Sequence, residues 1–188
     1  MNEKDKMLAG LVYNASDEQL FAERMHAKSV CHRFNMADPT QLEAQMAILK
    51  GLLIIKDRAH IEPNFFCDYG YNIDVGSNFY SNHNLTILDV CKVTIGDNVL
   101  IGPHVMISTA THPLDPIERQ HQEYGANVSI GNNVWIGGNV SILPGVAIGD
   151  NCVIGAGSVV TRDIPINSVA VGNPCRVTKT LATKVSAI

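Results

Sequence analysis

The sequence from residue 128 to residue 160, VSIGNNVWIGGNVSILPGVAIGDNCVIGAGSVV, repeats itself every six residues. An isoleucine or valine returns at each repeat from Ile130 to Val160, and a second column lies two positions earlier, from Val128 to Ser158. Glycine directly follows several of the isoleucines, where a turn needs a residue free of Cβ sterics. Apolar residues two apart lie on one face of a strand, and a turn every six residues stops each strand early. The chain therefore has to coil.

Composition does not explain this pattern. Eleven of the twelve column positions are apolar, whereas a chain with 46% apolar residues predicts about half as many. An upstream stretch repeats the pattern from Val75 to Ile107, and Ile107 lies 23 residues before Ile130, which is not a multiple of six. We therefore expect a polar loop at about 109–127 to protrude from the coil, and long excursions from a rigid scaffold often carry function.

Six-residue repeats of this kind resemble the left-handed parallel β-helices, in which three short faces form one triangular coil with stacked internal columns. The resemblance implies a mainly β fold and supplies the handedness, which runs against the usual right-handed crossover preference.

The first 57 residues differ from the rest and predict an N-terminal helical segment. Ser16-Asp17-Glu18-Gln19 is a capping box that opens a helix to about Phe34, and Asp38-Pro39-Thr40-Gln41 starts a second helix. We expect this pair of α-helices to cover one end of the coil, because an open end exposes strand edges and core. The β-helix domain with its C-terminal tail then spans 58–188.

Length and composition narrow the class of protein. With 188 residues and a net charge of -4, the chain fits one domain and lacks the basic balance of a nucleic-acid binder. Five scattered cysteines without a C-x-x-C pair predict reduced thiols. No apolar run approaches the roughly 20 residues that span a bilayer, and the first residues lack a signal peptide's apolar stretch. We expect no membrane partner and a cytoplasmic location.

With the repeat, the loop and the helices together, the chain resembles the maltose and galactoside O-acetyltransferases, and is most similar to the maltose branch. The resemblance covers nearly the whole chain. It implies transfer of acetyl from acetyl-CoA, as co-substrate, to a hydroxyl of a small sugar such as maltose or glucose, with no metal, in a homotrimer whose active sites lie between subunits. The motifs that carry it are Cys67-Asp68-Tyr69-Gly70-Tyr71-Asn72, Asn78-Phe79-Tyr80-Ser81-Asn82, Leu88-Asp89-Val90-Cys91, the segment from Thr109 to Pro116, Asn132-Asn133-Val134-Trp135-Ile136-Gly137-Gly138, and Gly172-Asn173-Pro174-Cys175-Arg176.

Two residues match the family's catalytic positions. The histidine of its T-x-x-H-P segment is the general base, here His112. The chemistry agrees, because a sugar hydroxyl is a poor nucleophile, a thioester is already activated, and histidine ordinarily titrates at about pH 6.5. The oxyanion of the tetrahedral intermediate needs fixed donors. The family's stabilising asparagine matches Asn82, which could alternatively be a turn residue with left-handed φ.

The acetyl-CoA site is expected to need a groove for the pantetheine arm and cations for the phosphates. From residue 160 onward, Arg162, Arg176, Lys179 and Lys184 outnumber Asp163, although a solvated basic face would look the same. By resemblance, the cofactor site holds Trp135, Gly138, Ala156, Thr161, Arg162, Arg176 and Lys179. Gly138 and Ala156 also suit the tight corners of a coil.

On the acceptor side, the family implies sugar contacts from Asp68, Tyr80, Asn82 and Asp89, with packing and turn chemistry as the alternative. Asp68 stands where the galactoside branch has serine and the maltose branch has aspartate, and a carboxylate there could accept from two hydroxyls. Val90 replaces an acidic residue of the galactoside branch, which disfavours galactosides.

Other functions remain open at this point. A serine or xenobiotic acetyltransferase shares the chemistry with a different acceptor. A zinc carbonic anhydrase on the same fold needs three convergent histidines, and no such triplet stands out among the seven histidines. A non-catalytic trimeric scaffold would have no affinity for CoA.

Overall fold

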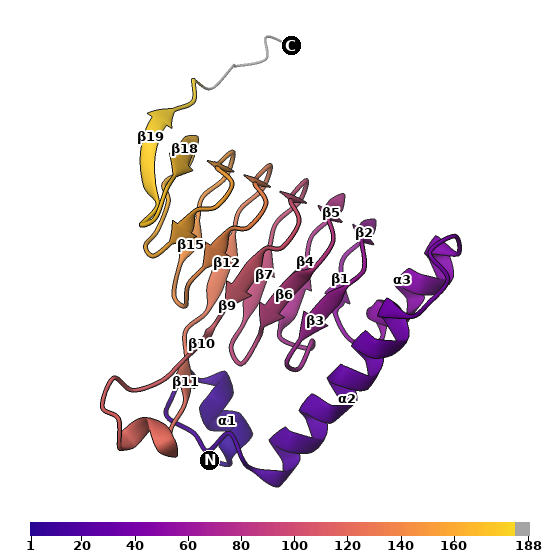
Figure 1. The fold of residues 1–188 in the computed structure, drawn as a ribbon, viewed down its shortest axis with the longest axis vertical. Helices are drawn as coiled ribbons and strands as arrows, with labels where there is room; N and C mark the ends of the chain where they lie inside the picture. The colour runs from indigo at the N-terminus through magenta and orange to yellow at the C-terminus, as the bar shows by residue number, and fades with distance from the viewer. Residues whose placement is uncertain (183–188) are drawn as a thin grey trace.

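A computed structural model, which describes residues 1–182, shows a parallel β-helix with helices packed at one end (Figure 1). The coil has three faces, and each turn of the coil, here called a rung, gives one strand to each face. The first face contains β1 (Ile54–Ile55), β4 (Ile73–Val75), β7 (Val93–Ile95), β12 (Val128–Ile130) and β15 (Ala147–Ile148). The second face contains β2 (Ala59–Ile61), β5 (Phe79–Ser81), β8 (Leu100–Ile101), β13 (Trp135–Ile136), β16 (Val153–Ile154), β18 (Ser168–Val171) and the antiparallel β19 (Arg176–Thr180). The third face contains β3 (Phe65–Cys67), β6 (Leu85–Leu88), β9 (Met106–Ser108), β14 (Ser141–Ile142) and β17 (Val159–Val160).

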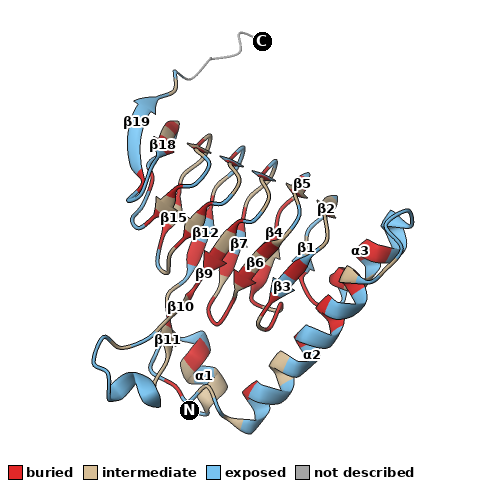
Figure 2. Cartoon of the chain, in the orientation of Figure 1, coloured by how far each residue is buried: buried red, intermediate tan, exposed pale blue. Residues whose placement is uncertain are grey.

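The core lies inside the coil, and Figure 2 shows the buried residues along the strands. All twelve column positions predicted between Val128 and Val160 are buried, and the later column pairs with itself one rung away, as Ile130 does with Ile148 and Ile136 with Ile154. The strands of the coil itself have only two to four residues, and buried side chains alternate with more exposed ones along them, two buried in strands such as β3 and β7 and one in strands such as β13. The repeat therefore predicted the core correctly.

The rungs differ in length because of one corner. In the early coil Asp74 pairs with Thr94, twenty positions on, whereas later Ser129 pairs with Ala147, eighteen positions on. The two additional residues lie between the third face and the first, in the segments 68–72 and 88–92. We call this junction the third corner, and the loop at 109–127 leaves the coil from the same corner. The junctions between the first and second faces, and between the second and third, are the first and second corners.

The first corner is a ladder of asparagines. Asn98 and Asn133 adopt positive φ and lie one above the other, and the Asn98 side chain donates to Asn133 Oδ1 at 3.1 Å. Asparagine tolerates this left-handed conformation better than most residues. Five rungs contribute to this ladder, through Asn78, Asn98, Asn133, Asn151 and Asn167.

Three helices precede the coil, one more than the sequence predicted: α1 (Glu3–Leu8), α2 (Glu18–Asn35) and α3 (Leu42–Lys50). Asp17, not Ser16, caps α2, because its carboxylate accepts from Leu20 N at 3.2 Å. The turn at Asp38 is closed by its own bonds to Thr40, so α3 begins only at Leu42. α2 and α3 pack on β3 and β2 and cover the first rung, as expected. Within residues 1–182 no helix has the length and apolarity needed to cross a membrane.

The protruding loop contains structure of its own. β10 (Ala110–Thr111) pairs antiparallel with β11 (Tyr124–Gly125), and a short 3-10 helix, η1 (Glu118–Gln120), lies between them. Figure 1 shows α1 and the N-terminus beside the base of this hairpin. A bridge between Tyr13 and Glu123 fastens the N-terminal segment to it. The loop is therefore anchored at its base instead of hanging free.

Candidate active site

The third corner brings together three residues that the sequence predicted for the site. Asp68 follows β3 on the first rung, Asp89 follows β6 on the second, and His112 follows β10 on the third. β3, β6 and β9 pair in register, so the segments that leave them stack along one edge of the coil. Residues far apart in sequence thus become neighbours at a single irregular edge.

His112 is exposed at the base of the hairpin, where its ring is oriented by the loop itself. Its Nδ1 lies 3.1 Å from the backbone carbonyl oxygen of Gln122. A carbonyl only accepts, so this contact assigns the ring proton to Nδ1 and leaves the lone pair of Nε2 available. A histidine held in this tautomer can act as a general base through Nε2. His112 lines a hollow with Asn14–Ser16 and 119–123.

Asp89 is fully buried, and its carboxylate shapes the corner. Oδ1 accepts from the backbone N–H groups of Asp68 and Tyr69, at 3.0 and 2.9 Å, and Oδ2 accepts from Gly70 at 2.7 Å. Burial raises the pKa of Asp89 to about 7, against the opposing effect of these N–H donors. A sugar cannot reach a fully buried carboxylate in this chain, so the geometry favours a positioning role over the expected direct contact.

Asp68 lies next to that turn and is half-buried. Burial, followed by the nearby Glu123 carboxylate, raises the pKa of Asp68, whereas Arg24 and Lys28 act in the opposite direction. The side chain is therefore partly desolvated and has charged groups of both signs nearby. Such a setting strengthens hydrogen bonds to a polar ligand.

Two other predicted site residues lie elsewhere. Tyr80 is on the second face, in β5, and Asn82 follows β5 at the second corner. Asn82 Oδ1 accepts from His83 N at 2.7 Å, and within residues 1–182 the Nδ2 of Asn82 donates no hydrogen bond, which leaves it free to bind an oxyanion. The Tyr80 ring stacks on His60, with centroids 5.7 Å apart and an interplanar angle of 4°. Tyr80 is followed across the sheet by Leu100 and Trp135, both exposed, so an apolar row runs over the outside of the second face.

Four of the expected cofactor residues lie at two different corners of the coil. Gly138 and Ala156 stack at the second corner, and a Cβ on the neighbouring Gly137 would come within 2.6 Å of Ala156 N. Close packing of the corner thus accounts for small residues there independently of any ligand. Thr161 and Arg162 follow β17, at the third corner two rungs beyond His112.

The basic tail lies at the far end of the second face. Arg176 and Lys179 are exposed on β19, which pairs with β18, and Arg176 Nη1 donates to Cys175 O at 2.7 Å. Lys184 lies outside the described residues. Exposed guanidinium and ammonium groups on a sheet edge suit phosphate binding.

The single chain does not bring His112 and Asn82 together. They stand on opposite sides of the third face, whose strands of two to four residues span about 7 to 13 Å at about 3.3 Å per residue. One set of residues, including His112 and Asp68, lies at the third corner; the other, including Asn82 and Gly138, lies at the second.

Several residues around Asp68 were not predicted from sequence. Arg24 donates to the Tyr69 hydroxyl at 2.7 Å and to Ala15 O at 2.6 Å, and Glu123 lies in the hollow beside His112. Position within the protruding loop was the only sequence signal for Glu123. Nothing in the repeat pattern points to Arg24 on α2.

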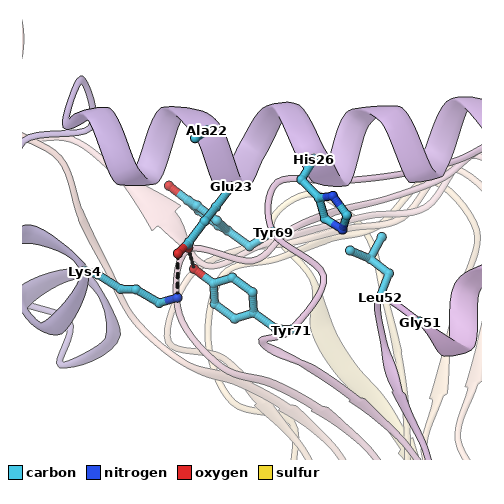
Figure 3. A pocket seen from close by; sticks show the side chains of 8 residues that line it. All are labelled: Lys4, Ala22, Glu23, His26, Gly51, Leu52, Tyr69 and Tyr71. Carbon is cyan, nitrogen blue, oxygen red and sulfur yellow. Dashed lines mark hydrogen bonds and ion pairs between the residues drawn. The ribbon is translucent and has the colours of Figure 1, made fainter.

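A larger hollow lies behind this corner, between α1, α2 and the 69–71 turn. Figure 3 shows Glu23 at its edge, where the carboxylate accepts from Lys4 at 2.8 Å and from the Tyr71 hydroxyl at 2.6 Å. None of the predicted site residues lines it. All five cysteines are free, as predicted, and all five are buried. Among residues 1–182, no three His, Cys, Asp or Glu side chains are grouped as metal ligands.

Comparison with known proteins gives two matching families. The maltose acetyltransferase hexapeptide capping motif matches residues 6–54, and the bacterial transferase hexapeptide (six repeats) matches residues 127–162. The galactoside O-acetyltransferase of Escherichia coli is 45% identical over 175 residues, covering 92% of this chain and 86% of its own.

Two solved structures are similarly close. A maltose O-acetyltransferase from Clostridium difficile has a TM-score of 0.94 and 53% identity over 97% of this chain and 98% of its own. A galactoside acetyltransferase in complex with coenzyme A has a TM-score of 0.93 and 44% identity, covering 97% of this chain and 92% of its own. These matches extend over the helices, the coil and the protruding loop.

Proposed function

Because this chain belongs to the maltose and galactoside O-acetyltransferase family, we propose that it moves acetyl from acetyl-CoA to a hydroxyl of a small sugar such as maltose or glucose. The observation that carries the proposal is the placement of His112, whose Nε2 is free to accept a proton, on the corner that also carries Asp68. A solved relative binds coenzyme A, which supports acetyl-CoA as co-substrate.

The reaction follows from these groups. His112 Nε2 takes the proton of the acceptor hydroxyl, whose oxygen attacks the thioester carbonyl carbon. The carbonyl oxygen becomes an oxyanion, to which Asn82 Nδ2 donates. When the C–S bond breaks, the electron pair leaves with sulfur, and the His112 imidazolium returns the proton to the CoA thiolate. The products are an acetyl ester and CoA.

The cofactor is proposed to lie along the second face. Trp135 would pack against the pantetheine arm beside the close-packed Gly138 and Ala156, and Arg176 and Lys179 would reach the phosphates. Thr161 and Arg162, at the third corner, would approach the same cofactor from another chain.

A trimer would complete each site. Since the third face separates His112 from Asn82 in one chain, we propose that His112 of one subunit meets Asn82 of the next, in a homotrimer with three shared sites. Asp68 and Tyr80 would then contact the sugar from the two sides, and Asp89 would hold the turn that bears Asp68. This enzyme would work in the cytoplasm, where acetyl-CoA is made.

The test is thiol release from acetyl-CoA with a panel of maltose, glucose, galactosides, serine and chloramphenicol. Turnover with maltose or glucose is the expected result. Turnover with serine or chloramphenicol alone would move the enzyme to another acceptor class. If no acceptor works and calorimetry detects no binding of CoA, the chain is a scaffold and the proposal is wrong.

A further inference from the structure

Two of the free cysteines face each other where α2 packs on the first rung. Cys31 lies on α2 and Cys67 ends β3, and their Sγ atoms are 3.7 Å apart in a buried hydrogen bond between the thiols. Two other cysteines are bonded differently, since Cys91 and Cys152 each donate to a backbone carbonyl oxygen. A disulfide holds its sulfur atoms about 2 Å apart, so this pair would have to close by roughly 1.7 Å. Rotation of the two side chains can supply a movement of that size.

Both thiols line one hollow, so a small reagent can reach them although Cys31 and Cys67 are only 2% and 6% exposed. The hollow has a volume of about 460 Å³ and lies between α2 and the segment 64–67. Lys28 and His32 line it from α2. A nearby cation stabilises a thiolate, and reactive cysteines typically have such surroundings.

The two thiols differ in acidity. The hydrogen bond from the Cys67 thiol lowers the pKa of Cys31, against the opposing effects of burial and of the Asp89 charge. The same hydrogen bond, and then burial, raise the pKa of Cys67. Cys31 therefore ionises first, and the thiolate is the form of cysteine that attacks an electrophile.

We propose that Cys31 and Cys67 are a site of reversible oxidation by hydroperoxides, at which they form a disulfide between α2 and β3. The Cys31 thiolate attacks one oxygen of hydrogen peroxide. An S–O bond forms as the O–O bond breaks, and the departing hydroxide takes up the proton that Cys31 had released. The Cys67 sulfur then attacks the sulfenic sulfur of Cys31. An S–S bond forms, the S–O bond breaks, and the oxygen leaves with the Cys67 proton as a second water, so two thiols have given two electrons to the peroxide.

This disulfide would tie the helical segment to the strand that ends directly before Asp68. In the proposed cytoplasmic location thiols are kept reduced, so the bond would form when peroxide rises and would be reversed by thiol exchange. The site does not depend on the proposed acetyl transfer.

The experiment treats the reduced protein with hydrogen peroxide, removes the excess, counts free thiols in denaturant and maps the peptides without reduction. The wild type should fall from five free thiols to three, with one disulfide joining the Cys31 and Cys67 peptides. Dithiothreitol should restore all five thiols. The bond should lie within one chain, so the oxidised protein should migrate as a single chain on a non-reducing denaturing gel.

Variants separate the two steps of the oxidation. Cys67→Ser should accumulate a sulfenic acid at Cys31, which dimedone traps, whereas Cys31→Ser should keep all its thiols. Cys152→Ser is the matched control, because Cys152 is equally buried but its sulfur faces a carbonyl oxygen, and it should form the disulfide as wild type does. Five thiols remaining in the treated wild type, or a disulfide that joins other cysteines, would overturn the assignment, and this result requires no variant to fold.

Discussion

Asp89 shows how one side chain can serve a site without facing it. Its carboxylate accepts from three consecutive N–H groups and so fixes the backbone at Asp68. The pKa of this buried group is raised to about 7, whereas in the unfolded chain it returns to its ordinary value near 3.8. Between these two values the folded protein binds a proton that the unfolded chain has lost.

The contribution of Asp89 to stability should therefore fall with rising pH. It is full below about pH 4 and decreases up to about pH 7, because ionisation is easier in the unfolded chain. Thermal melts of wild type and Asp89→Asn at pH 4.5, 6 and 7.5 measure this. The wild-type Tm is expected to drop relative to that of Asp89→Asn across the series. A constant difference would contradict the raised pKa.

For individual residues, the sequence indicated which side chains to consider for the site more easily than what each side chain does. His112 was predicted as the base because a conspicuous loop and its motif surround it, and that role stays a prediction. Asp89 was expected to contact sugar, yet its burial assigns it to the backbone of 68–70. The pairing of Tyr13 with Glu123 could not be foreseen, since it joins segments outside the repeat.

Among the elements, the asparagine ladder of the first corner makes a contribution to the stability of the fold that can be measured separately. Asn98 has a φ of 58° and is bonded on both sides, accepting from Asn78 and donating to Asn133. Alanine there would strain the left-handed backbone by about 1 to 2 kcal/mol and remove both bonds. Glycine would remove the bonds without the strain.

We expect the free energy of unfolding to fall in the order wild type, Asn98→Gly, Asn98→Ala, with the alanine variant lower by about 2 kcal/mol. Urea denaturation measures the series, and Thr94→Ala, an exposed position on the preceding strand, is the control. Equal losses for glycine and alanine would show that backbone strain plays no part.

The period of six predicted the strands, the buried columns and the place where the loop leaves the coil. It could not predict twenty-residue rungs, because the residues added in 68–72 and 88–92 interrupt the pattern without carrying one of their own. α1 was missed because six residues are too few for helical periodicity to show. The β10–β11 ladder inside the loop was missed because strands of two residues are too short to show an alternating pattern.

For the whole molecule, the decisive feature is the separation of His112 and Asn82 by the third face. The sequence predicted both residues but not their distance, which depends on which corner each one occupies. If neighbouring chains complete the site, light scattering should report a trimer of the 20.4 kDa chain. A monomer with full activity would contradict shared sites.

Mixed trimers give a sharper prediction. His112→Ala and Asn82→Ala chains, each inactive alone, should regain activity when they are co-expressed or co-refolded. Random mixing leaves about a quarter of the sites with an intact His112 from one chain and an intact Asn82 from its neighbour. About a quarter of wild-type activity is expected. No recovery would place both groups of one site in the same chain.

The most direct test of sugar acetyl transfer by His112 is the initial rate of thiol release from acetyl-CoA with glucose, for wild type and His112→Ala. His32→Ala, an exposed histidine on α2 away from the hollow of His112, is the control. We predict glucose-dependent turnover in wild type and control, and a loss of kcat of at least about 10² in His112→Ala with unchanged thermal stability. A His112→Ala variant that acetylates glucose as fast as wild type would contradict the assignment of His112 as the base.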